Sequence, residues 1–401
     1  MKKEITVAFA SFACLAAMAT SPVHNKVFEY VPAPGQFVNL LPEWSKGDNA
    51  SIMAEKALEA TTVDESIISL GAFGGYVTFG FPSTIVNVEG KRDIYIEGNA
   101  FKAGDTSNSG ASAEPGVVMV SYDINGNGLP DDEWFEIAGS EYRYSTHNYE
   151  ITYFKPASDN DNIKWTDNQG KSGEIVKLQY HKQPYWPQWL AGETELKFKG
   201  TRLPDNAVNQ GTTENPYFVL YAYDYGYADN HPNLDDNGNY NEDAKIDIDW
   251  AVDQNGNAVK MPGVDFVRIY TGTNQFNGWI GESSTEVGRV LNAHIKTVCN
   301  VESVDESVKI DQNVLNAFLS KYGQGGVGEL ANDNVRIYVN AEGIISFTIN
   351  RDANVAVYDS MGKCRYTSFH KAGKNEVNVS NLESGIYIVN VDGKSTKILK
   401  K

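Results

Sequence analysis

Val264-Asp-Phe-Val-Arg-Ile-Tyr270 is the stretch that decides the fold class, because its side chains alternate between a buried and an exposed face. This period of two is typical of a β-strand that lays one face on a core. Comparable short stretches precede it, each bounded by Gly, Asn, Asp or Pro: residues 75–81, 93–98, 117–122, 149–154 and 194–199. Many short strands without helical periods between them favour an antiparallel β-sandwich over an α/β sheet. We therefore predict an all-β chain, with one clear helix at 51–60.

The charge balance narrows the class of function. The 401 residues include 34 Lys and Arg against 52 Asp and Glu, which gives a formal net charge of −18. A surface this acidic repels phosphate backbones and anionic lipid, so we predict no nucleic-acid partner. It suits divalent cations, cationic ligands or neutral polymers such as glycans.

The first residues have the pattern of a signal peptide. Lys2 and Lys3 precede the apolar run 5–19, which is too short to span a bilayer. The run ends in Ala17-Met-Ala19, which places small side chains at the two positions that a signal peptidase reads. We predict cleavage at the end of this run, and the alternative is a lipoprotein signal acylated at Cys14. No other apolar run reaches about 18 residues, so we predict an exported protein without a transmembrane segment.

A small all-β unit follows Gly323-Gln-Gly-Gly-Val-Gly328, a stretch with the composition of a flexible linker. The unit contains Val357-Tyr-Asp359, Gly362, Val377-Asn-Val-Ser-Asn-Leu382 and Ser384-Gly-Ile-Tyr-Ile-Val389. These motifs resemble the C-terminal sorting domain of the Bacteroidetes type IX (Por) secretion system, with its Leu-x-x-Gly-Ile-Tyr core. The resemblance implies an Ig-like β-sandwich at 333–401, the type IX secretion machinery as a partner, and an extracellular or outer-surface location.

Motifs in the central region carry a second resemblance. They are residues 74–81, 94–101, 114–123 and 281–287. They resemble an uncharacterised family of Bacteroidetes cell-surface proteins with a jelly-roll, galactose-binding-like look. This implies a fold and a location but no reaction. The predicted organisation is a signal peptide at 1–19, a jelly-roll ligand-binding domain at 29–296, a linker at 297–332 and the C-terminal sorting domain at 333–401.

One loop has the spacing of a calcium site. The predicted ligands are Asp123, Asn125, Asn127, the carbonyl of Leu129, Asp131 and Glu133. Oxygen side chains at the first, third, fifth and ninth positions, with Gly128 at the sixth, follow the first part of a calcium-binding loop. The twelfth position is Trp134 rather than Glu, so Glu133 or Glu136 has to close the site. We predict Ca²⁺ here, and a plain hairpin turn is the alternative explanation of the same residues.

A second acidic loop, 233–243, also alternates oxygen donors. Its glycine stands at the wrong offset for such a loop, so a solvated loop is the favoured interpretation. Residues 253–257 are predicted to form a plain β-turn between strands.

An aromatic segment is the predicted ligand-binding surface. Its candidate residues are Tyr180, His181, Tyr185, Trp186 and Trp189. Pro184 and Pro187 disfavour regular structure, so we expect the rings to lie on a loop. Exposed aromatic faces suit the CH-rich faces of sugar rings. The alternative is that the loop folds over one end of the sandwich as a hydrophobic plug.

Catalysis has little support in the sequence. It contains no Gly-x-Ser-x-Gly elbow, His-Glu-x-x-His, P-loop or dinucleotide fingerprint. We therefore predict a surface-displayed, non-catalytic protein that binds a glycan or another cell-surface ligand. The alternatives are a glycoside hydrolase or lyase that uses Asp/Glu pairs, and a protein that captures a bulky nutrient such as a corrinoid.

Overall fold

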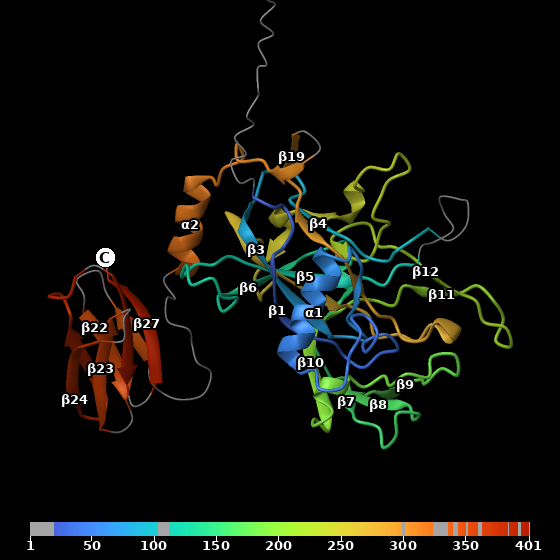
Figure 1. Cartoon of the computed structure of the whole chain (residues 1–401), viewed down its shortest axis with the longest axis horizontal. Helices are drawn as coiled ribbons and strands as arrows, with labels where there is room; N and C mark the ends of the chain where they lie inside the picture. The colour runs from blue at the N-terminus through green and yellow to red at the C-terminus, as the bar shows by residue number, and fades with distance from the viewer. Residues whose placement is uncertain are drawn as a thin grey trace, which may run out of the picture. The chain divides into compact units, whose positions relative to one another are not determined.

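The computed structural model describes residues 20–102, 112–298 and 301–323, and six C-terminal segments. The C-terminal segments are 336–339, 344–349, 352–359, 363–383, 385–391 and 394–400. The predicted signal peptide, including Cys14, lies outside the described residues. The chain divides into two compact units (Figure 1): Met1–Tyr122 with Trp134–Val314, and Asp123–Glu133 with Leu315–Lys401.

The predicted all-β fold is confirmed. Throughout the described ranges, the paired strands form antiparallel sheets, with two α-helices: α1 (Ala50–Thr62) and α2 (Gln312–Tyr322). The predicted helix at 51–60 is α1, and the side chain of Asn49 caps it by accepting a hydrogen bond from Ile52 N. No described helix is both long enough and apolar enough to cross a membrane.

The largest sheet of the first unit has the order β1-β3-β16-β5-β6-β15, and β13 also pairs with β5. Its strands are β1 (Lys26–Val31), β3 (Tyr76–Val86), β5 (Gly116–Ser121), β6 (Trp134–Ile137), β13 (Tyr227–Ala228), β15 (Ala251–Val252) and β16 (Gly263–Thr271). The fold-deciding stretch 264–270 is the interior of β16, which pairs with β3 on one side and β5 on the other. Helix α1 packs against β1 (Figure 1).

A second sheet of four strands, β10-β7-β8-β9, completes the sandwich. Its strands are β7 (Thr146–Phe154), β8 (Ile163–Asp167), β9 (Ser172–Ile175) and β10 (Glu195–Arg202). Buried side chains of both sheets form one core cluster, which includes Val117, Tyr149, Ile151, Tyr153, Ile163, Leu196, Phe198 and Tyr270. Burial of such large apolar and aromatic surfaces is the main force that holds two sheets together.

Short elements complete the first unit. Strand β2 (Ile68–Ser69) pairs with β17 (Glu286–Val287), and β4 (Ile94–Ile96) pairs with both β14 (Lys245–Ile246) and β18 (Val290–Asn292). Two further pairs are β11 (Ala207–Asn209) with β12 (Phe218–Leu220), and β19 (Ile295–Val298) with β20 (Val301–Val304). The 3-10 turns are η1 (Tyr142–Tyr144), η2 (Gln188–Leu190), η3 (Glu242–Ala244), η4 (Ile248–Trp250) and η5 (Gly278–Ile280).

The second unit contains a small β-sandwich of its own. One sheet has the order β21-β22-β25 and the other β24-β23-β26-β27. The strands are β21 (Arg336–Val339), β22 (Ile344–Ile349), β23 (Ala353–Asp359), β24 (Cys364–His370), β25 (Gly373–Asn378), β26 (Gly385–Val391) and β27 (Lys394–Lys400). Ile345 and Phe347 of one sheet pack with Val355, Val357 and Val389 of the other. The jelly-roll assignment and the domain boundaries at 29–296, 297–332 and 333–401 stay predictions.

Candidate functional site

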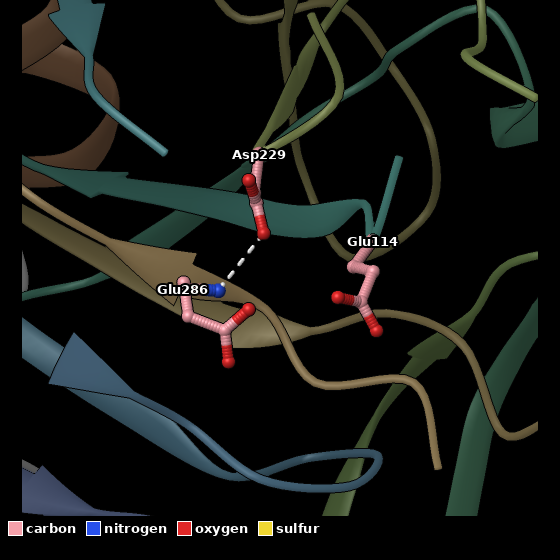
Figure 2. Close-up of side chains that lie close together, drawn as sticks. All are labelled: Glu114, Asp229 and Glu286. Atoms are coloured by element: carbon pink, nitrogen blue, oxygen red, sulfur yellow. Dashed lines mark hydrogen bonds between the residues drawn. The ribbon is translucent and has the colours of Figure 1, made fainter. Parts of the chain in front are cut away.

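Three carboxylates meet inside the first unit. Glu114 precedes β5, Asp229 follows β13, and Glu286 begins β17 (Figure 2). One oxygen of each lies within 4.8 Å of the others. Asp229 is 3% exposed and Glu286 5%, whereas Glu114 is partly exposed. Sequence reasoning missed this cluster, because more than a hundred residues separate its first member from its second and no motif links them.

Hydrogen bonds tie this cluster to the surrounding backbone. Asp229 Oδ2 accepts the N–H of Glu286 at 2.9 Å, and its Oδ1 accepts the N–H of Asn99 (Figure 2). Glu114 Oε1 accepts the N–H of Ser284 at 2.9 Å, and Ser284 Oγ donates to Glu286 Oε1 at 2.9 Å. The cluster therefore joins segments that are distant in sequence, and its oxygens already accept hydrogen bonds from the chain.

Burial controls the protonation of the three groups. It raises the pKa of Asp229 to about 7, although backbone N–H groups oppose the shift. Burial, followed by the negative charges of the neighbouring carboxylates, raises the pKa of Glu114 and that of Glu286 well above their usual range. At neutral pH the cluster therefore needs either shared protons or a cation. Carboxylate oxygens are the ligands that hard divalent cations prefer, so these three residues are able to hold one.

The predicted calcium loop brings most of its candidate ligands together. Asp123 Oδ1 accepts the N–H of Asn127 at 3.0 Å, and Asp123 Oδ2 accepts that of Gly128 at 2.8 Å. Gly128 has a φ of 72°, as the sharp turn requires. The amides of Asn125 and Asn127 both donate to Asp131 Oδ1 at 3.1 Å. Calcium binding itself stays a prediction.

A residue outside the predicted ligand set also takes part in the hydrogen bonds of this loop. Asp132, which was not among the predicted ligands, closes the loop, because its Oδ2 accepts the N–H of Ile124 at 3.0 Å. Leu129, whose backbone carbonyl is a predicted ligand, and Glu133 are both exposed, and their binding to an ion stays a prediction. Leu129 donates its N–H to Asn127 Oδ1 at 2.7 Å, and this hydrogen bond helps to hold the turn.

A related turn recurs three times in the first unit. In each copy an Asp carboxylate accepts the N–H groups two and four residues later, and the Gly three residues later has a positive φ: Asp167 with Gly170, Asp235 with Gly238, and Asp253 with Gly256. Backbone capping by the carboxylate accounts for these Asp-x-x-Gly patterns. The plain turn predicted at 253–257 is confirmed, and the loop 233–243 shares its geometry.

Most rings of the predicted aromatic surface are not exposed. Tyr185 and Trp186 are buried in the sandwich core. Trp189 stacks on Tyr30 with 5.7 Å between ring centroids. The ring of His181 meets Phe37 edge to face; its exposure is intermediate.

The segment therefore adopts the plug arrangement, because its large rings gain more from core burial than from exposure. Tyr180, which is 80% exposed, keeps its ring on the surface. Ligand binding by this segment stays a prediction.

Other aromatic rings are exposed on the segment that follows β16. Trp279 is 64% exposed and Phe276 47%. Asn277 N donates to the carbonyl of Gly281 at 2.8 Å, and Phe276 forms a β-bridge with Glu282. The segment is thus a short closed hairpin that presents two rings, and no sequence motif had marked it.

The C-terminal residues 331–401 match the family model described as a secretion system C-terminal sorting domain. The chain carries a type IX sorting domain. The resemblance predicted for 333–401 is therefore confirmed, and it indicates export and a cell-surface or extracellular location. No curated protein matches the chain. Because the match begins at 331, it bears on export and not on what the first unit binds.

Proposed function

We propose that the protein is displayed on the cell surface and binds a glycan through its first unit without catalysing a reaction. The sorting domain supports the location. The first unit supplies the ligand-binding surface. The observation that carries the proposal is the pair of exposed rings on the hairpin after β16.

The geometry of that hairpin supports recognition of sugars. Trp279 lies within η5, and the chain on both sides of it is joined by the bridge between Phe276 and Glu282. A ring held on a closed hairpin loses little conformational entropy on binding. Indole and phenyl faces pack well against the CH groups of sugar rings, and an uncharged ligand avoids repulsion by a chain of net charge −18.

The three-carboxylate cluster favours binding over hydrolysis. A glycosidase needs two carboxylates that flank a scissile bond, with room for the substrate between them. Asp229 and Glu286 are buried, and their oxygens accept hydrogen bonds from the chain. These hydrogen bonds suit a structural role, in which the two carboxylates hold the segment after β13 against β17.

The proposal includes a calcium-stabilised loop at 123–133. Asp123, Asn125, Asn127 and Asp131 are linked by hydrogen bonds, which supports a common ligand set. The ion would stabilise the loop and not take part in a reaction.

A glycan array with the exported chain, from Thr20 onward, tests the proposal. Trp279→Ala should lose binding to the glycans that the parent chain retains. Tyr144→Ala is the matched control, because Tyr144 is 77% exposed but lies on η1. Equal loss in both variants, or no bound glycan at all, would contradict the proposal.

A further inference from the structure

Three polar side chains link the two sheets of the first unit: Glu136 of β6, His147 of β7 and Thr201 of β10. Thr201 Oγ1 lies 2.6 Å from Glu136 Oε2 and 3.1 Å from His147 Nδ1. The other ring nitrogen of His147, Nε2, lies 3.0 Å from the backbone carbonyl oxygen of Tyr142. All three distances are those of hydrogen bonds, so the side chains form one network that ends on a peptide carbonyl.

Thr201 holds the centre of this network in place. Its side chain belongs to the interior, because the residue is only 3% exposed. Its backbone N–H donates to the hydroxyl oxygen of Tyr270 in β16 at 2.8 Å. Strands β6 and β16 belong to the large sheet, whereas β7 and β10 pair in the second sheet. The network therefore ties one sheet to the other.

The hydrogen bonds restrict the protonation of the network. A peptide carbonyl only accepts, so His147 Nε2 must carry a proton to donate to Tyr142. In a neutral imidazole the second nitrogen, Nδ1, then has no proton and is an acceptor. An ionised Glu136 carboxylate is also an acceptor. The one hydroxyl proton of Thr201 cannot serve both acceptors, so with neutral His147 and ionised Glu136 one contact would join two acceptors.

One additional proton satisfies every contact, and two arrangements can hold it. In the first, His147 is protonated, its Nδ1–H donates to Thr201 Oγ1, and the Thr201 hydroxyl donates to the Glu136 carboxylate. In the second, the Glu136 carboxyl group is protonated and donates to Thr201 Oγ1, and the Thr201 hydroxyl donates to His147 Nδ1. Conversion of the first into the second moves the Nδ1 proton to Thr201 and the Thr201 proton to Glu136. The total number of protons stays the same.

The surroundings of Glu136 also favour retention of a proton. Burial raises the pKa of Glu136 to about 7, and the hydrogen bond from Thr201 opposes the shift. The ionisable groups that face this carboxyl group are three phenols, Tyr142 of η1, Tyr227 of β13 and Tyr270 of β16.

Burial raises the pKa of each of these phenols, so all three are neutral near pH 7. Two carboxylates lie beyond them, Glu141 beside Tyr227 and Asp253 beside Tyr142. On the other side of the network, the ring of His147 lies 4.3 Å from the ring of Tyr142. Negative charges beyond the phenols make a further negative charge on Glu136 less favourable.

We propose that Glu136, Thr201 and His147 hold one proton in common at neutral pH, and that this shared proton stabilises the contact between the two sheets. The inference does not depend on the proposed glycan binding. Isolated carboxyl and imidazole groups have pKa values of about 4.3 and about 6.5, so above pH 6.5 the unfolded chain has lost the proton that the folded network keeps. The network's contribution to the free energy of unfolding is therefore present at about pH 6.5 and is lost as the pH rises further.

NMR spectroscopy at pH 7.5 tests whether the proton is shared. The ¹³C signal of the Glu136 carboxyl carbon and the ¹⁵N signals of the His147 ring report the two protonation states. The parent chain should carry one proton over the two groups. Glu136 should be ionised in His147→Ala, because the Thr201 hydroxyl then has only the carboxylate to serve, and His147 should be neutral in Glu136→Gln.

His231→Ala is the matched control, because His231 Nε2 also meets a backbone carbonyl, that of Asp224 at 3.3 Å. This variant should keep the shared proton. Two results would overturn the proposal: loss of the proton from both groups in the parent chain at pH 7.5, or a remaining group that keeps its proton in both single variants.

Urea denaturation at pH 6.5 and pH 8.5 gives a second measurement. Glu136→Gln places an amide N–H beside Thr201 Oγ1, which satisfies the network without an additional proton. The fall in unfolding free energy between the two pH values should therefore be smaller in Glu136→Gln than in the parent chain. Glu150→Gln removes an exposed carboxylate of β7 and should keep the fall of the parent chain. Equal falls in Glu136→Gln and the parent chain would overturn the proposal.

Discussion

Asp229 Oδ2 accepts the backbone N–H of Glu286 at 2.9 Å, so the first strand residue of β17 is held by a buried acid from the segment after β13. This contact places a second carboxylate, that of Glu286, beside Asp229 inside the fold. The stability of the first unit should therefore depend on pH in a definite direction.

The pKa of Asp229 is raised from 3.8 to about 7, and that of Glu286 is also raised. A carboxyl group with a raised folded-state pKa binds protons more tightly in the folded state. The contribution of such a group to the free energy of unfolding is fully present below pH 3.8 and is lost as the pH rises toward 7. We expect the free energy of unfolding, measured by urea denaturation in EDTA, to be lower at pH 8 than at pH 5.

Glu286→Gln isolates the effect of the cluster, because it removes one charge while it keeps an oxygen that accepts from Ser284. The difference in unfolding free energy between pH 5 and pH 8 should shrink by more than about 1 kcal/mol, since one pKa unit corresponds to about 1.4 kcal/mol. An unchanged pH dependence would contradict the prediction, because it would show that Glu286 does not take up a proton between pH 8 and pH 5.

Two buried threonines differ in their hydrogen bonds. Thr271 and Thr273 are both fully buried, but Thr271 Oγ1 donates to the carbonyl of Gly71 at 2.7 Å, whereas Thr273 Oγ1 makes no hydrogen bond to the described part of the chain. Thr271→Val should cost about 1–3 kcal/mol of unfolding free energy, because it leaves that carbonyl unpaired. Thr273→Val should be neutral or slightly stabilising. Urea denaturation of the two variants measures this difference. Equal losses of unfolding free energy would contradict the statement that the Thr273 hydroxyl makes no hydrogen bond to the described residues.

The sequence could predict the features that local patterns determine. The strand at 264–270 follows from alternation, and the helix predicted at 51–60 lies within α1. It could not predict that Glu114, Asp229 and Glu286 meet, because tertiary packing alone brings them together. It also could not decide that Tyr185 and Trp186 are buried, since proline-rich aromatic loops occur both as plugs and as binding surfaces.

Calcium should stabilise the chain through the loop 123–133. At a hundredfold excess over Kd, a ligand that binds only the folded state adds about 2.7 kcal/mol. The parent chain should therefore melt at a higher temperature in millimolar Ca²⁺ than in EDTA. Asp123→Ala should abolish that difference. Asp253→Ala should keep it, because Asp253 lies in the plain turn 253–257, where its carboxylate accepts two backbone N–H groups. Without any calcium-dependent shift in the parent chain, the hydrogen-bonded turn is the complete explanation.

Limited proteolysis tests the predicted domain boundaries. Cleavage should fall between about 298 and 333, since exposed linkers are cut before folded domains. Mass spectrometry of the fragments should give one product from the first unit and one that contains β21–β27. A full-length core that resists cleavage would count against separate domains.

The most direct test of the central claim is a glycan array of the chain from Thr20 onward, with mass spectrometry of the soluble products from each bound glycan. We predict that at least one neutral glycan binds, that Trp279→Ala removes the binding, and that the bound glycan is recovered intact. Glycan cleavage above background that is lost on changing one carboxylate would contradict the account, as would the absence of any bound glycan.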